Sequence, residues 1–83
     1  MDKNKIEEMQ DKATRRRDGV FSMWPYTHYA VLKNKLVWYA EFIWPESYNI
    51  YQLLFWFAVI VWEAIDKKDA INKLEYIIFN IEN

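Results

Sequence analysis

Apolar residues recur along this chain at spacings of three and four, which is the period of an amphipathic helix. Near the start, Ile6, Met9 and Ala13 form a narrow apolar stripe. We therefore predict a first helix over residues 3–17. The segment that follows it, residues 20–27, is rich in aromatic side chains and contains a proline, so we predict an aromatic loop there.

The same spacing continues through the rest of the chain and predicts three further helices, over residues 28–43, 45–66 and 70–81. Pro45 stands at the first position of the third of these helices, where a missing N–H costs nothing. The chain contains few turn-forming residues, which disfavours an all-β fold. The sequence thus predicts a single all-α domain over residues 1–83, a bundle of about four helices.

The predicted helix over residues 45–66 is apolar on two opposite sides. One side gathers the aliphatic residues expected in a core, and the other side is aromatic. The predicted helix over residues 28–43 has the same character. Several aromatic residues exposed together exceed what soluble monomers usually show, so we predict a homo-oligomer. Alternatively, the outer helices and the aromatic loop cover both sides within one chain. The predicted oligomer interface consists of Trp38, Phe42, Tyr51, Phe55 and Trp62.

The uninterrupted apolar run from Leu53 to Trp62 raises the question of a membrane. A spanning helix needs roughly 20 apolar residues, and this run is well short of that length. A buried helix is therefore the preferred interpretation, with a membrane-associated small protein as an alternative.

The composition excludes several kinds of functional site. The 83 residues carry a net charge of −1 and include no cysteine, one histidine and one glycine. These counts exclude a disulfide framework, a thiolate or multi-histidine metal site and a glycine-rich phosphate loop. The charge does not favour binding of double-stranded nucleic acid. No pair of carboxylates is spaced for acid–base work, so we expect no enzyme and neither a cofactor nor a metal. The lack of cysteine and the polar start of the chain lead us to expect a cytoplasmic protein.

Three consecutive arginines before Gly19 are the main candidate for function. Cations in the last turn of a helix complement its dipole, and a glycine ends the helix, so one interpretation is that these residues only cap the first helix. Guanidinium groups also grip phosphates, and aromatic rings stack on bases, so the arginines and the aromatic loop together suit a nucleotide. The predicted ligand-binding residues are Arg15, Arg16, Arg17, Trp24, Tyr26 and His28.

Two main hypotheses for function remain open. The first is a non-enzymatic binding protein of phage or mobile-element type, which captures an anionic ligand such as a nucleotide or cyclic nucleotide. The second is a protein-interaction inhibitor that masks a host enzyme with its Trp-, Tyr- and Arg-rich surface, because these residue types dominate protein–protein hot spots.

Overall fold

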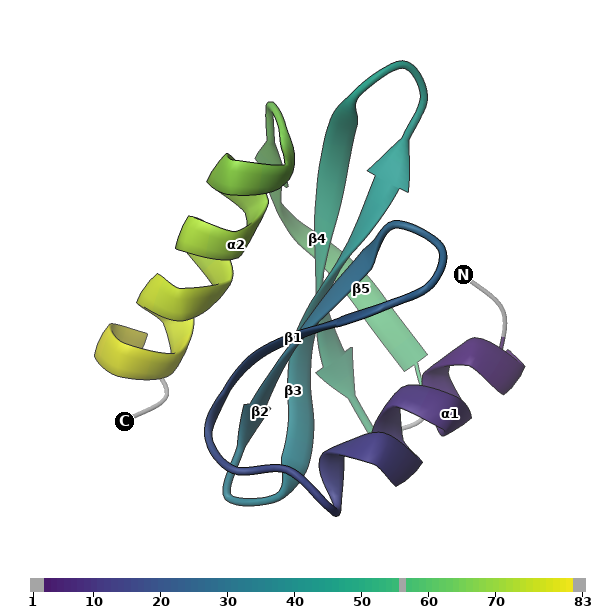
Figure 1. Cartoon of the computed structure of the whole chain (residues 1–83), viewed down its shortest axis with the longest axis vertical. Helices are drawn as coiled ribbons and strands as arrows, with labels where there is room; N and C mark the ends of the chain where they lie inside the picture. The colour runs from purple at the N-terminus through teal and green to yellow at the C-terminus, as the bar shows by residue number, and fades with distance from the viewer. Residues whose placement is uncertain (1–2, 56, 82–83) are drawn as a thin grey trace.

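The computed structural model describes residues 3–55 and 57–81, and it shows an antiparallel five-stranded sheet with a helix on each face (Figure 1). Residues 1–2, 56 and 82–83 of the predicted domain lie outside the described residues. The elements are α1 (Lys3–Ala13), β1 (Gly19–Met23), β2 (Thr27–Leu32), β3 (Lys35–Ile43), β4 (Ser47–Leu54), β5 (Phe57–Ala64), α2 (Lys67–Tyr76) and a π-helix (Ile77–Ile81). The strands follow one another across the sheet in chain order.

The prediction of an all-α bundle is therefore wrong, and the predicted helix over residues 28–43 is the hairpin of β2 and β3. Lys33 and Asn34 adopt φ angles of 55° and 62°, which turn the chain back on itself. Every residue of β2 is buried, because the strand is covered on both faces. Its residues from Tyr29 to Leu32 form an uninterrupted run without the alternation of apolar and polar residues by which strands are recognised.

The predicted helix over residues 45–66 and the predicted loop over 20–27 are also strands. The first segment folds into β4 and β5, which are joined through Phe55 at a φ of 56°. The second contributes β1 and the turn to β2. Valine, isoleucine, phenylalanine, tryptophan and tyrosine dominate β3 to β5, and these residue types fit a pleated surface.

Helices do form at the two ends of the chain, where charged residues alternate with apolar ones at helical spacing. The first helix ends at Ala13 instead of residue 17. The last helix begins at Lys67, three residues before its predicted start, because the Asp66 carboxylate accepts a hydrogen bond from the Asp69 amide at 2.8 Å.

The sheet separates two apolar cores. On one face, Leu74 of α2 and Ile77 of the π-helix are buried against strand residues that include Ile50. On the other face, α1 packs Met9 and Ala13 against β2 and β3. The α2-face cluster comprises Ala30, Leu32, Trp38, Ala40, Tyr48, Ile50, Ala64, Ala70, Leu74, Ile77 and Ile78. The α1-face cluster comprises Met9, Ala13, Met23, Tyr29, Val31, Leu36 and Tyr39.

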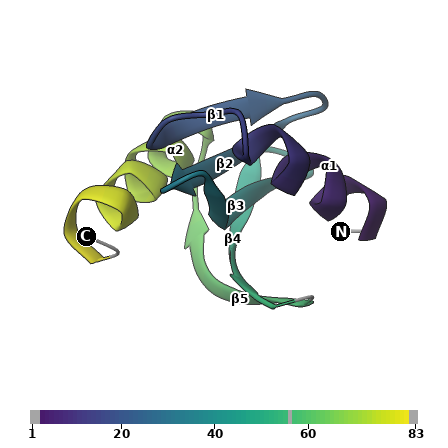
Figure 2. The ribbon, with the colours of Figure 1, turned by 90° about the horizontal axis from the view of Figure 1, so that it is seen from below.

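The last strand, β5, differs from the others in its exposure. Of its residues only Ala64 is buried, although all but Glu63 are apolar. Figure 2 shows why, because β5 lies at the end of the curved sheet, beyond the region between the two helices. The register between β4 and β5 shifts between Ile50 and Tyr51, which leaves Val61 as an extra residue, a β-bulge.

The residues predicted to form an oligomer interface occupy different environments. Trp38 is only 9% exposed and belongs to the α2-face cluster. Phe42 and Tyr51 are half-buried, while Trp62 and especially Phe55 are exposed. They do not form the continuous helical surface on which the prediction was based. In the part of the chain that is described, no helix is long and apolar enough to cross a membrane.

Candidate functional site

The three arginines lie on the connection between α1 and β1. The helix ends in a tight turn, in which the Arg15 and Arg16 amides donate to the carbonyls of Lys12 and Ala13. All three arginine side chains are exposed. Arg15 forms an ion pair with Asp11 at 3.0 Å, four residues earlier. The cations thus follow the end of the helix, as the capping interpretation requires, and among the described residues the Arg15 side chain forms an ion pair with the helix itself.

Two hydrogen bonds tie this connection to the turn between β2 and β3. The Asn34 side-chain amide donates to the Arg16 carbonyl at 2.6 Å. The Lys33 amide donates to the Asp18 carboxylate at 2.7 Å. Because the turn belongs to a buried hairpin, these bonds hold the backbone that carries the arginines against a rigid element.

Joining these two segments concentrates positive charge at one end of the sheet. The two segments and their flanks carry six cationic and two acidic side chains, an excess of four positive charges in a chain whose net charge is −1. Fixed charges of one sign gathered in this way attract anions. The cations are Lys12, Arg15, Arg16, Arg17, Lys33 and Lys35, and the acids are Asp11 and Asp18.

Arg16 is at the centre of this basic end. It borders two hollows, one of about 470 Å³ shared with Arg17, Asp18 and Asn34. The second, of about 260 Å³, is lined by Lys12, Arg15 and Arg16. The Arg16 guanidinium lies over the Phe21 ring at 4.7 Å from its centroid. Stacking on an aromatic ring fixes the plane of the guanidinium group and leaves its N–H groups to point outward.

The aromatic residues predicted to join the arginines lie at the other end of the sheet. Trp24 and Tyr26 are exposed in the turn after β1, whereas Arg17 precedes that strand. Five extended residues span roughly 17 Å, at about 3.3 Å each. The structure therefore brings Arg15, Arg16 and Arg17 together but separates them from Trp24, Tyr26 and His28.

His28 is buried in β2, with 4% of its surface exposed. Its Nδ1 atom shares a hydrogen bond of 2.8 Å with the Ser22 hydroxyl. Sequence reasoning missed this pair, although antiparallel pairing of β1 with β2 places the two residues opposite each other. His28 Nε2 has no hydrogen-bond partner among the described residues. The pair therefore lacks the carboxylate that orients the base in a catalytic triad.

A cavity of about 300 Å³ lies beside His28, between the two neighbouring hairpin turns and the start of α2. Burial, and after it the nearby Lys67 ammonium, lowers the pKa of His28 below its ordinary value of 6.5. Burial also raises the pKa of Tyr48, which shares this cavity. Both side chains are therefore neutral at pH 7, and neither supplies a fixed charge.

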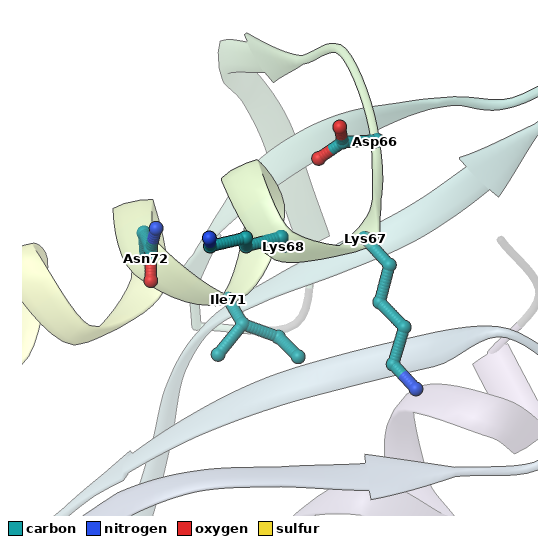
Figure 3. A pocket seen from close by; sticks show the side chains of 5 residues that line it. All are labelled: Asp66, Lys67, Lys68, Ile71 and Asn72. Carbon is teal, nitrogen blue, oxygen red and sulfur yellow. The ribbon is translucent and has the colours of Figure 1, made fainter.

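The start of α2 borders a further pocket, of about 470 Å³. Figure 3 shows Lys67 and Ile71 extending from the helix toward the strands beneath, with Asp66 on the turn before it. Charges of both signs surround this pocket, and Asp66 already caps the helix. The basic end, in contrast, combines an excess of four positive charges with two hollows. Among the described residues, no three histidine, aspartate or glutamate side chains gather as a metal site would require.

No protein-family model, curated protein or solved structure matches this chain. Function is therefore inferred from the geometry and charge of the described residues.

Proposed function

We propose that this protein is a non-enzymatic binding protein that captures a phosphate-bearing anion, such as a nucleotide, at its basic end. The observation that carries the proposal is the position of Arg16 between two hollows within an excess of four positive charges. A guanidinium group offers a planar fork of donors that fits a phosphate bidentately. Arg17 lines the larger hollow and has no ion pair among the described residues, so it is available to a ligand.

The ligand class follows from size and charge. A hollow of about 470 Å³ lies within the range of small-molecule sites, roughly 300–1,000 Å³. Because the exposed cations are close to water, phosphate contacts there are screened by salt, so binding weakens as the salt concentration rises. The predicted stacking by Trp24 and Tyr26 is not part of this proposal, since these rings lie at the other end of the sheet.

Calorimetric titration with ATP, adenosine and inorganic triphosphate tests the proposal. We expect ATP and triphosphate to bind and adenosine not to bind. Arg16→Lys keeps the charge but loses the fork, so it should weaken ATP binding by about tenfold, the equivalent of about 1.4 kcal/mol. Lys68→Arg is the matched control, because it exchanges the same two cationic side chains, with the charge kept, at an exposed position outside the basic end. Equal binding of ATP and adenosine, or no effect of the arginine substitution, would contradict the proposal.

A second candidate function, the masking of a partner protein, is supported by two exposed tryptophans. Trp24 and Trp44 are 80% and 85% exposed in the turns that follow β1 and β3. Both turns lie at the same end of the sheet, as the Tyr26 carbonyl accepting from the Phe42 amide at 3.3 Å indicates. If Trp24 and Trp44 form a hot spot, a host protein that binds the wild-type chain should not bind the double variant Trp24→Ala, Trp44→Ala.

The membrane-associated alternative has no supporting observation in the described structure. The cytoplasmic setting expected from the composition stays a prediction.

A further inference from the structure

We propose that β5 pairs with β5 of a second copy of this chain, in antiparallel orientation, to join two sheets into one across a two-fold axis. The basic end and its ligand have no part in this inference. An edge strand presents unpaired backbone donors and acceptors, and natural proteins usually protect such an edge with charges, proline or a covering element. Along β5 the only charged residue is Glu63, and Val59 to Trp62 are all exposed.

The sequence of β5 fits its own copy in one register in particular. Residues that face each other across a pair of strands lie on the same face of the sheet. The bulge at Val61 shifts the alternation by one residue, so that Phe57, Val59, Trp62 and Ala64 lie on the α2 face. A two-fold axis between Ile60 and Val61 brings residues of the same face together on either side of the bulge. The facing pairs are then Phe57–Ala64, Ala58–Glu63, Val59–Trp62 and Ile60–Val61.

In this register the side chains that face each other are compatible in size and in charge. Phe57, a large side chain, faces the small Ala64, and Trp62 faces Val59. Glu63 faces Ala58, so the two glutamates do not meet, and like charges directly opposite each other would be destabilising. Lys73 already donates to the Glu63 carbonyl at 2.6 Å and lies over the Trp62 ring, so the edge near α2 is covered at Glu63. Because the two-fold axis places Ala58 opposite Glu63, the backbone from Val59 to Trp62 is left for the second strand.

The buried area indicates a modest affinity. A fully exposed large side chain presents about 200 Å². With exposed fractions of 37–55% for the large residues from Phe57 to Trp62, each copy offers on the order of 400 Å² of apolar side chain. Two copies together reach about 800 Å², to which the paired backbones add, compared with roughly 1,200 Å² for the smallest stable interfaces. We therefore expect a dimer that forms with rising concentration in the micromolar range.

The test is the molar mass by light scattering across a concentration series, with Ile60→Lys and Ile60→Thr. Ile60 is 55% exposed and belongs to neither core cluster. A lysine there should raise the dissociation constant at least tenfold, while threonine retains strand propensity and should weaken the dimer less. Phe79→Lys is the matched control, because Phe79 is similarly exposed, at 65%, but lies in the π-helix after α2. It should leave the dimer unchanged.

Amide hydrogen exchange distinguishes strand pairing from other contacts. Pairing predicts that the amides between Ala58 and Trp62 exchange more slowly as the protein concentration rises, with no such change in α1. The inference is overturned by a monomer at all concentrations, by a dimer that Ile60→Lys does not weaken, by equal weakening through Phe79→Lys, or by concentration-dependent protection outside β5. Circular dichroism of each variant confirms that the monomer is folded.

Discussion

Substitution of Leu74 by alanine is the most direct test of how α2 packs on the sheet. Leu74 is completely buried in the α2-face cluster, and its helix contacts all five strands of the sheet. Removing a buried leucine side chain costs both its transfer free energy and the energy of the cavity left behind, together about 2–5 kcal/mol. A domain of this size is stable by roughly 4–12 kcal/mol, at about 0.05–0.15 kcal/mol per residue.

A loss near 3 kcal/mol would therefore remove a quarter or more of the stability. It should lower the melting temperature by roughly 12–24 °C, since 1 kcal/mol corresponds to about 4–8 °C in a small domain. Urea unfolding followed by circular dichroism at one fixed protein concentration measures the change. Phe79→Ala is the control, because an exposed side chain should contribute less than about 0.5 kcal/mol. A loss below about 1 kcal/mol for Leu74→Ala, or equal losses for both variants, would refute this packing.

Two further predictions concern single polar groups. The lowered pKa of His28 means that the unfolded chain binds more protons than the folded chain at this group. The contribution of His28 to the free energy of unfolding is therefore complete above pH 6.5 and is lost as the pH falls below that value. Urea unfolding between pH 5 and 8 should show a free energy of unfolding that rises with pH, and His28→Gln should flatten this dependence. Asp66→Ala removes the acceptor for the Asp69 amide and should cost about 1 kcal/mol in the same assay, whereas an unchanged midpoint would show that the cap contributes nothing.

The extent to which the fold follows from the sequence depends on the element. At the two ends of the chain, charged residues fill the outer sides of α1 and α2, so the helical period was visible and the predictions were close. In the middle, β2 is buried on both faces, and its apolar residues satisfy several periods at once. Period alone cannot separate a buried strand from a buried helix. The abundance of β-branched and aromatic residues from Lys35 to Ala64 was the signal that favoured strands.

The candidate site, too, could be predicted only in part from the sequence. The side chains of Arg15 to Arg17 are exposed, in keeping with the rule that a charged run seldom enters a core. Their proximity to Trp24 was expected because a loop was predicted between them, and a loop can fold back. An extended β1 holds them apart instead. The contribution of the turn at Asn34 was not visible in the sequence, since it depends on a hydrogen bond between residues 18 positions apart.

The order of the strands has a consequence for how the chain acquires its structure during synthesis. Each strand pairs only with its neighbours in the sequence, so successive hairpins can form as the chain emerges, and little loop entropy opposes each step. The helix α2, which covers one face of the sheet, follows all five strands in the chain. Until α2 has been made, the strand residues Ala30, Trp38 and Ile50 have no cover on that face. A chain interrupted before Lys67 would therefore present a sheet with one bare apolar face, and exposed apolar surface of this kind is prone to aggregate.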